Sequence, residues 1–283
     1  MAVPATELTD RLTELDLQLL SLGSVLVAFS GGADSAFLLA AAVRALGPGR
    51  VAAATAISPS LAAGELGPAR RFAESLGVVH ETPDTQELRR AGYRANAGDR
   101  CYFCKAELLD VLGPVADRLG LAQVATGTNA DDAIAGFRPG IRAAAERGAV
   151  TPLRDAGLTK AHVRAASRAW GLPTWDKPAA ACLSSRIAYG VQITPARLAR
   201  VDRAEASLRA ALAAADISVR DLRIRDLGEH GARVEVDADL VGVLQRRPDL
   251  LAAVTGFDVV TVDPRGFRSG SMNELLADPA AYR

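Results

Sequence analysis

Short apolar runs alternate with longer segments of helical periodicity over the first two thirds of the chain. Runs rich in aliphatic and β-branched residues predict strands at residues 25–29, 51–57, 78–80 and 123–126. The helical segments between and around them cover residues 6–22, 36–43, 65–76, 105–119 and 159–170. This alternation predicts the fold class α/β, with a doubly wound parallel sheet that binds a ligand at the carboxyl ends of its strands.

The pattern changes at about residue 194 and predicts a second, smaller α/β unit. Its predicted elements, in chain order, are helix 195–212, the hairpin strands 219–225 and 233–236, helices 239–245 and 248–254, and strand 258–262. We therefore expect two domains, a larger one at residues 1–190 and a smaller C-terminal α/β domain at residues 191–283.

The loop Ser30-Gly31-Gly32-Ala33-Asp34-Ser35 joins the first predicted strand to a helix. Its glycines let the backbone approach an anion closely, and the loop amides and the helix N-terminus direct positive partial charge at that anion. The hydroxyls of Ser30 and Ser35 can donate to it, while Asp34 suits a Mg²⁺ ion that bridges phosphates. The loop lacks the Gly-Lys-Ser/Thr ending of a Walker A motif and is not GxGxxG. It resembles the pyrophosphatase loop (PP-loop) of ATP enzymes that cut between the α- and β-phosphates; an ordinary strand-to-helix turn is the alternative.

The charge balance and the composition indicate which partners and which cellular location to expect. The 283 residues carry 33 basic and 33 acidic side chains, so no net field draws the chain to nucleic acid or to a membrane. No apolar run approaches the length of a membrane span and no charged-then-apolar leader is present, so we expect a cytoplasmic protein. Arginine is the usual cation, since lysine occurs only as Lys105, Lys160 and Lys177.

The three cysteines favour metal or redox chemistry over a disulfide framework. Cys101 and Cys104 are spaced so that both sulfurs can reach one metal ion or cluster near a helix start. Cys182 would be a third ligand that the fold brings in. Such a set can hold a [4Fe–4S] cluster with one iron open; a zinc site completed by another residue, or unliganded cysteines, are the alternatives.

Polar residues follow the strand predicted at 123–126. Gly127 and Asp132 lie at its carboxyl end, where they suit a nucleotide or Mg²⁺ site or, equally, a helix N-cap with acidic residues in its first turn. Arg138 comes next and can clamp a phosphate or carboxylate, or lie on a surface loop.

The long connection at residues 175–186 combines a thiol, a lysine, two hydroxyls and Arg186. So many polar residues on one loop favour function over packing. Further on, Arg223 and Arg225 share one face of a strand, because side chains two residues apart point the same way. They form an anion site if that face is open, and an exposed charged face is the alternative.

The motifs SGGADS, TGTNADD, FRPG, KPAAACLSSRIAYG and GFRSGSMN together resemble the LarE family of ATP-dependent sulfur transferases. The resemblance implies a fold of the adenine nucleotide alpha-hydrolase type and the use of ATP and Mg²⁺. It implies that the substrate is pyridinium-3,5-biscarboxylic acid mononucleotide, whose carboxylate is adenylated and converted to a thiocarboxylate. That product is the precursor of the nickel pincer cofactor of lactate racemase. A homo-oligomer is also expected.

The resemblance assigns roles residue by residue. The residues implied to bind ATP phosphates and Mg²⁺ are Ser30, Gly31, Gly32, Asp34 and Ser35. The residues implied to handle the substrate phosphate and the neighbouring sulfur chemistry are Glu205, Arg223, Arg225, Glu235 and Arg268. With Gly127, Asp132, Arg138 and Arg186, these form the predicted ligand-binding set.

The family draws on two sulfur sources. Members with only the loop cysteine, here Cys182, give up its sulfur and are left with dehydroalanine. Members with an added CxxC resemble cluster-dependent sulfur carriers. Because this chain has Cys101 and Cys104, we favour a [4Fe–4S] cluster held by all three cysteines, whose open iron carries the sulfide.

Other functional classes remain open at this point. A transfer-RNA thiolase also pairs a PP-loop with cluster cysteines, although the zero net charge opposes RNA binding. An ammonia-using amidase such as an NAD synthetase would leave the cysteines idle. A non-enzymatic nucleotide-binding regulator with a structural metal would release no pyrophosphate.

Overall fold

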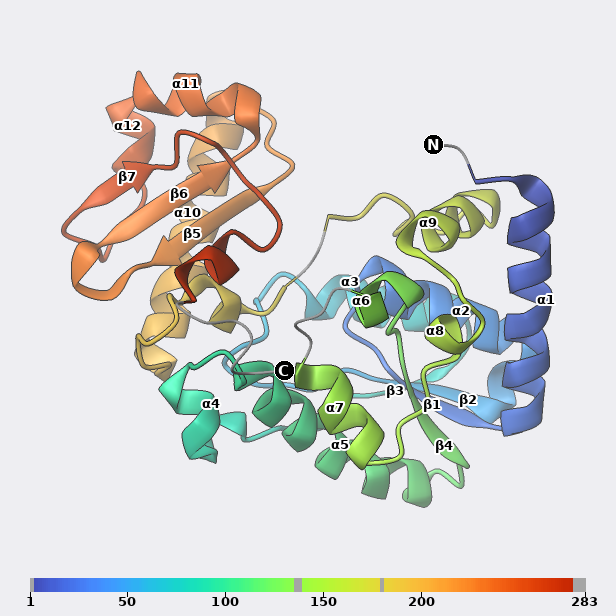
Figure 1. The fold of residues 1–283 in the computed structure, drawn as a ribbon. Helices are drawn as coiled ribbons and strands as arrows, with labels where there is room; N and C mark the ends of the chain where they lie inside the picture. Colours follow the sequence, from blue (N-terminus) through green and yellow to red (C-terminus); the bar gives the residue numbers. More distant parts are fainter. Residues whose placement is uncertain (1–2, 135–138, 179–180, 277–283) are drawn as a thin grey trace.

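A parallel sheet of four strands, in the order β3-β2-β1-β4, organises the first part of the chain (Figure 1). Its strands are β1 (Val25–Ala28), β2 (Val51–Ala54), β3 (Val79–Glu81) and β4 (Gln123–Thr126). The computed structural model describes residues 3–134, 139–178 and 181–276. Because the strands pair in parallel, with Val25 opposite both Val51 and Gln123, their carboxyl ends share one edge. The chain reverses its direction of travel across the sheet between β1 and β4, which is where open α/β sheets bind ligands.

Helices cover both faces of this sheet, as the doubly wound class requires (Figure 1). The helices of one face are α1 (Ala5–Leu22), α2 (Ala33–Leu46), α3 (Leu66–Ser75) and α9 (Lys160–Ala169), and α5 (Arg100–Arg118) covers the other. Val25 shares a core with the first group, whereas Leu26 packs with Leu112 of α5. Successive strand residues point to opposite faces, so neighbouring residues of β1 belong to different cores. The predicted α/β fold is confirmed.

Short helical segments connect these elements, and of these the sequence offered only α6, as the helix start with acidic residues in its first turn. They are η1 (Pro48–Arg50), η2 (Glu87–Arg89), α4 (Ala91–Ala95), α6 (Ala130–Ile134), α7 (Pro139–Glu146), α8 (Pro152–Asp155) and η3 (Leu183–Arg186). Segments of about two turns or fewer carry too little periodicity to be recognised in the sequence. None of the helices in the described residues is long and apolar enough to cross a membrane.

A smaller sheet, in the order β5-β6-β7, forms the C-terminal unit (orange in Figure 1). Its strands are β5 (Leu222–Asp226), β6 (Ala232–Val236) and β7 (Val260–Val262). Its helical segments are α10 (Pro195–Ala214), η4 (Gly228–His230), η5 (Ala238–Leu240), α11 (Val241–Gln245), α12 (Pro248–Leu251) and η6 (Ser271–Leu275). β5 and β6 form the predicted antiparallel hairpin, while β7 pairs with β6 in parallel.

Several predicted strands are shorter than expected, β5 and β2 among them. β5 begins at Leu222 rather than at residue 219, because the backbone N–H groups of Arg220 and Asp221 donate to the Asp237 carboxylate at 2.7 and 3.1 Å instead of joining the strand ladder. β2 ends at residue 54 rather than 57, and Ile57 makes only an isolated bridge.

The core of the smaller unit extends into the segment that follows Cys182. Leu183 and Ile187 are buried with the residues of β5 and β6, and Tyr93 of α4 joins the same core. Ile187 also forms a bridge with Asp226 at the end of β5. The segment around Cys182 is thus held by both parts of the chain. The domain division at residues 190 and 191 stays a prediction.

Candidate active site

The loop after β1 forms a turn that opens directly into α2. Gly31 has a φ of 71°, a conformation that favours glycine, and Gly32 is the N-cap residue of α2 without a side-chain cap. The Oγ atoms of Ser30 and Ser35 lie 3.1 Å apart beside this turn. Hydroxyls and the positive end of a helix therefore lie together where the sequence predicts the ATP phosphates.

The end of β4 approaches the same turn. A Cβ atom on Gly127 would lie 2.9 Å from the backbone N of Ser35, which is closer than real Cβ contacts. Only glycine fits this approach between the end of a strand and the start of α2. The structure therefore places Gly127 against the PP-loop.

Two carboxylates lie beside the turn. Asp34 Oδ2 accepts a hydrogen bond from Asn129 Nδ2 at 3.2 Å. Burial raises the pKa of Asp34, and the negative charge of Asp132 raises it further. Lys160 Nζ lies 3.4 Å from Asp132 Oδ1. Mg²⁺ usually takes one or two protein carboxylates together with substrate phosphates, and a divalent cation would relieve the repulsion between Asp34 and Asp132, so this pair fits the ion.

Two residues outside the predicted set also belong to this site. Asn129, which is fully buried, orients Asp34, and its position in TGTNADD was the available signal. Lys177 Nζ donates to the carbonyl O of Gly31 at 3.0 Å and to Glu65 Oε2 at 2.7 Å.

The three cysteines are free thiols that the fold brings into one neighbourhood. Cys101 and Cys104 lie at the start of α5, and Cys182 is the N-cap residue of η3. Burial raises the pKa of the Cys104 thiol, and the charges of Cys182, Glu87 and Cys101 raise it further. The thiols of Cys101 and Cys182 belong to exposed residues.

The thiol group, defined as Cys101, Cys104 and Cys182, offers the donor type that a [4Fe–4S] cluster requires. Within the described ranges, however, no group of three His, Cys, Asp or Glu side chains is placed to hold a metal ion. Coordination by all three thiols therefore requires their side chains to turn toward one another.

Asn96 and Arg100 form a clamp that joins the two cysteine-bearing segments. Asn96 is fully buried, and its Nδ2 donates to carbonyls of the segment after Cys182, those of Ile187, Ala188 and Val191. Arg100 Nη1 donates to Asn96 Oδ1 at 2.6 Å and to the carbonyl O of Ser184 at 3.0 Å. This clamp was not predicted, because nothing local to Asn96 indicates its distant partners.

We expect Asn96→Ala to lower the free energy of unfolding by about 3 kcal/mol, because buried carbonyls and Arg100 lose partners at roughly 1–3 kcal/mol each. Alanine is also strained at the φ of 54° that Asn96 adopts. Asn96→Gly is the matched variant, since it loses the same hydrogen bonds without the strain and should fall between wild type and alanine. Urea unfolding measures both variants. A change below about 0.5 kcal/mol in each would contradict the clamp.

A buried hydroxyl network lies beneath the same segment. Tyr93 OH shares hydrogen bonds with Ser60 Oγ at 2.5 Å and with Ser184 Oγ, and Ser60 Oγ donates to Glu87 Oε1 at 2.9 Å. Burial raises the pKa of Tyr93, and the charge of Cys182 raises it further, so the phenol stays neutral. The network ties Ser184 to the first part of the chain.

Arg186 and Glu205 anchor the Cys182 segment to the smaller unit. Arg186 pairs with Glu205 through Nε at 2.9 Å and Nη2 at 3.2 Å, and Arg186 Nη1 donates to the carbonyl O of Cys182 at 3.0 Å. Glu205 Oε1 also accepts from the backbone N of Ile224 in β5 at 3.1 Å. Arg186 is only 4% exposed, so its contacts position Cys182.

Arg223 and Arg225 lie on a buried face of β5. Arg225 Nη2 pairs with Glu235 Oε2 at 2.6 Å, and Arg225 Nη1 donates to the carbonyl O of Ser185 at 3.1 Å. Burial lowers the pKa of Arg223 to about 10, and the adjacent arginines add to that shift. Arg223 and Arg225 are only 7% and 5% exposed, so this face is neither the exposed charged face nor the open anion site that the sequence offered, and substrate binding there stays a prediction.

The two remaining predicted arginines are Arg268 and Arg138. Arg268 pairs with Glu274 near the C-terminus, with its Nη2 at 3.1 Å from Glu274 Oε2. Arg138 lies outside the described residues.

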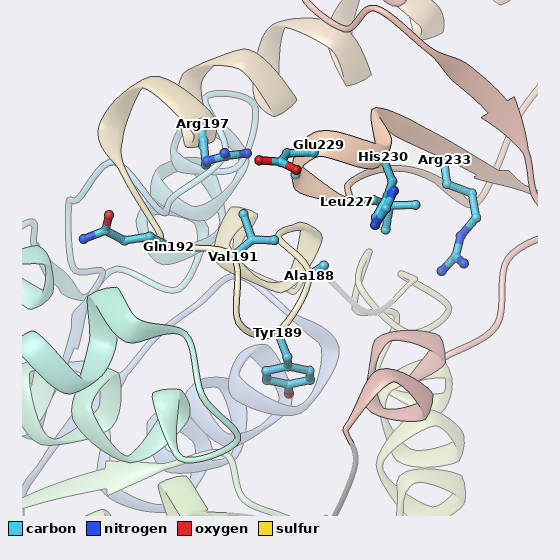
Figure 2. A pocket seen from close by; sticks show the side chains of 10 residues that line it. Ala188, Tyr189, Val191, Gln192, Arg197, Leu227, Glu229, His230 and Arg233 are labelled. Atoms are coloured by element: carbon cyan, nitrogen blue, oxygen red, sulfur yellow. The ribbon is translucent and has the colours of Figure 1, made fainter.

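A cavity of about 590 Å³ opens between the segment after η3 and the hairpin turn (Figure 2). Tyr189 lines one side, and Glu229 and His230 of η4 line another. The guanidinium of Arg100 lies 5.3 Å from the centre of the Tyr189 ring, so the cavity borders the start of α5. Its volume suits a small organic ligand.

Comparison with protein-family models finds no match. An uncharacterised protein of Synechocystis is 41% identical over 260 residues, which cover 90% of this chain and 94% of that protein. The pyridinium-3,5-bisthiocarboxylic acid mononucleotide synthase of Lactiplantibacillus plantarum is 34% identical over 255 residues, 89% of this chain and 90% of the synthase. An uncharacterised protein of Methanocaldococcus jannaschii is 25% identical over 176 residues, 62% of this chain and 66% of that protein.

Proposed function

Because the chain belongs to the LarE family of ATP-dependent sulfur transferases, we propose that it converts pyridinium-3,5-biscarboxylic acid mononucleotide to its thiocarboxylate. The relative from Lactiplantibacillus plantarum is named for the bisthiocarboxylic acid mononucleotide. One observation carries the proposal for this chain. Lys177 contacts the PP-loop, and Cys182, a few residues further along the same segment, neighbours Cys104. A nucleotide-binding turn and a sulfur donor are thereby joined.

The proposed reaction begins with adenylation. A substrate carboxylate oxygen attacks the α-phosphorus of ATP, the bond from that phosphorus to the bridging oxygen breaks, and pyrophosphate leaves. A sulfide then attacks the acyl carbon, and AMP leaves with the former carboxylate oxygen. If the Cys182 thiolate attacks instead, the resulting thioester must lose its Cα proton and break its Cβ–S bond, which releases the thiocarboxylate and leaves dehydroalanine. The N-terminus of α2 and the hydroxyls of Ser30 and Ser35 would hold the phosphates. Asp34 and Asp132 would hold a Mg²⁺ ion that neutralises the charge developing on pyrophosphate.

For the sulfur source we propose a [4Fe–4S] cluster held by the thiol group. When bound, such a cluster supplies a sulfide on its open iron. The exposure of Cys101 and Cys182 and the mutual proximity of the thiols support this assignment. Arg186 and Asn96 would keep Cys182 close to the start of α5. The other source is the sulfur of Cys182 itself.

Arg223 and Arg225 are proposed to bind the phosphate or carboxylate of the substrate. We expect Arg223→Ala to raise the KM for the pyridinium mononucleotide more than the KM for ATP. One lost charge-assisted bond costs on the order of 1.5–3 kcal/mol, or roughly tenfold to a hundredfold in binding. Arg225→Ala should likewise raise the KM for the pyridinium mononucleotide more than the KM for ATP. It should also lower the stability of the protein, because Glu235 loses a buried partner. Steady-state kinetics with each substrate varied measures the effect.

The control for these variants is Arg247→Ala, which removes an exposed arginine paired with Asp249 in α12. It should leave both KM values unchanged. Unaltered substrate KM in the double variant of Arg223 and Arg225 would remove these residues from the binding site.

The decisive test of the function is mass spectrometry of the pyridinium mononucleotide after anaerobic incubation with the protein, ATP, Mg²⁺ and sulfide. We expect the mass increase of oxygen-to-sulfur exchange, with AMP and pyrophosphate formed in step. An unchanged mononucleotide in protein that binds ATP without consuming it would point to a nucleotide-binding regulator instead.

A homo-oligomer, a cytoplasmic location and the absence of nucleic-acid binding stay predictions from the sequence. Light scattering after size-exclusion chromatography measures the first of these.

A further inference from the structure

Lys177 reaches the PP-loop from a segment that lies far away in the sequence. Its Nζ donates to the carbonyl O of Gly31 at 3.0 Å and to Glu65 Oε2 at 2.7 Å. We propose that Lys177 binds the β- and γ-phosphates of ATP and the pyrophosphate that leaves, and that Glu65 is its partner when the site holds no nucleotide. This inference rests on the proposed function only in taking ATP as a substrate.

In the residues that the structure describes, the ammonium of Lys177 has one N–H donor that is free to bind a phosphate. A lysine side chain carries three N–H donors, and in the described part of the chain two acceptors bind those of Lys177, Gly31 O and Glu65 Oε2. The side chain is 24% exposed, so the remaining proton has access to a ligand in the site.

The ammonium of Lys177 lies beside the turn that would hold the phosphates. A Cβ atom on Gly31 would lie 3.9 Å from Lys177 Nζ, so the charge stands over the turn itself. The N-terminus of α2, which has no side-chain cap, adds its partial positive charge at the same place.

Opposite charges flank the PP-loop from two sides. Because β1 lies between β2 and β4, Glu65 and Lys177 lie on the side of β2, whereas Asn129, Asp34 and Asp132 lie on the side of β4. A triphosphate on the turn would therefore have Lys177 on one side and carboxylate-held Mg²⁺ on the other. A cation that contacts the departing pyrophosphate stabilises the charge that develops there.

The choice of lysine supports the same assignment. Lysine supplies only 3 of the 33 basic side chains, and two of them, Lys160 and Lys177, contact residues of the nucleotide site. Lys160 pairs with Asp132 at 3.4 Å, and the charge of Asp132 also reaches Lys105, which is half-buried. An ammonium donates in three diverging directions, as Gly31 O, Glu65 and a phosphate require, whereas the planar fork of arginine cannot.

The test compares Lys177→Met, Lys177→Arg and Glu65→Gln by titration calorimetry with ATP, pyrophosphate and AMP, without the pyridinium substrate. We expect Lys177→Met to weaken ATP and pyrophosphate binding by roughly tenfold to a hundredfold and to leave AMP binding unchanged. Lys177→Arg should not restore the loss. Glu65→Gln should tighten ATP and pyrophosphate binding, because it frees a donor and removes a negative charge.

The matched control is Arg247→Met, which removes a cation that is paired with a carboxylate at the same distance of 2.7 Å in the smaller unit. It should change none of the three affinities. If Lys177 served only to hold Glu65, then Glu65→Gln and Lys177→Met would weaken ATP binding alike. That result, or an equal loss of AMP binding, overturns the proposal.

Failure of the proposed function would look different. Wild-type protein that binds ATP and pyrophosphate but makes no thiocarboxylate would contradict that function and leave the role of Lys177 standing. Should Lys177→Met fail to fold, which thermal unfolding reveals, the opposite effects expected for Glu65→Gln and Lys177→Arg still decide the matter.

Discussion

Replacing Cys182 by alanine is expected to abolish sulfur transfer while ATP–pyrophosphate exchange continues at close to the wild-type rate. The thiol is exposed at the start of η3 and neighbours Cys104, whereas the PP-loop contacts of this segment are made by Lys177. Removing the sulfur therefore removes the donor without touching the groups that hold ATP. The two measurements are thiocarboxylate formation by mass spectrometry and isotope exchange between pyrophosphate and ATP.

Cys101→Ala and Cys104→Ala separate the two sulfur sources. With a cluster held by all three cysteines, each variant should lose transfer, and anaerobic wild-type protein supplied with sulfide should turn over more than once. With a sacrificial cysteine, both variants should keep a single turnover, and Cys182 should end as dehydroalanine. Iron-free wild-type protein that completes one turnover and carries dehydroalanine at position 182 would exclude the cluster.

Asp34→Asn is expected to remove most adenylation while leaving the protein as stable as the wild type or more so at neutral pH. Asp34 lies in the first turn of α2, and its charge is opposed by burial and by Asp132. The amide keeps the shape of the side chain but cannot offer a carboxylate to Mg²⁺. Pyrophosphate release and AMP formation measure the loss of activity. ADP and inorganic phosphate as wild-type products would contradict the PP-loop assignment.

The stability of Asp34→Asn should depend on pH with a defined sign. Because the pKa of Asp34 is raised in the folded protein above the ordinary value of 3.8, the folded state holds this proton more tightly than the unfolded state. The wild type therefore loses stability as pH rises from 3.8 through the raised pKa, and the asparagine variant does not. Its advantage is present at neutral pH and disappears below about pH 3.8. Thermal unfolding across this range measures it.

Asp16→Asn is the matched control for Asp34→Asn. Burial also raises the pKa of Asp16, but this residue lies on α1 rather than on the nucleotide-binding turn. Because Asp16 is exposed, its variant should gain less stability, with the same sign of pH dependence, and keep full adenylation. Loss of adenylation in Asp16→Asn would show that the effect at Asp34 is not specific to the ion site.

The elements of the nucleotide site could be recognised from the sequence because each depends on residues close together in the chain. A buried run followed by two glycines predicts a strand, a turn and a helix start, and β1, the turn and α2 lie at those positions. β4 occupies residues 123–126 as predicted, and the antiparallel hairpin of the smaller unit was likewise found from its alternation and its turn. The spacing of hydrophobic residues and the conformational preference of glycine are local properties of the chain. They can therefore be recognised in the sequence before the tertiary structure is known.

The proximity of the thiols was only partly predictable. The spacing of Cys101 and Cys104 at one helix start is a local feature. The approach of Cys182 depends instead on the hydrogen bonds that Asn96 and Arg100 donate to the segment after it. The sequence indicated that three cysteines would act together, but not what holds them in place.

Which polar groups meet was decided by the tertiary structure alone. Arg225 was predicted to share an anion site on an open strand face, and Arg186 to belong to a functional loop. In the folded chain Glu235 and Glu205 pair with them in the interior. Lys177 gave no sign that it would reach Gly31. A long side chain can pair with any carboxylate or carbonyl that packing brings within reach. Which partner it finds therefore depends on how the two sheets and their helices are assembled. Burying a charge without a partner is costly, and the possible partners become neighbours only when the chain is folded.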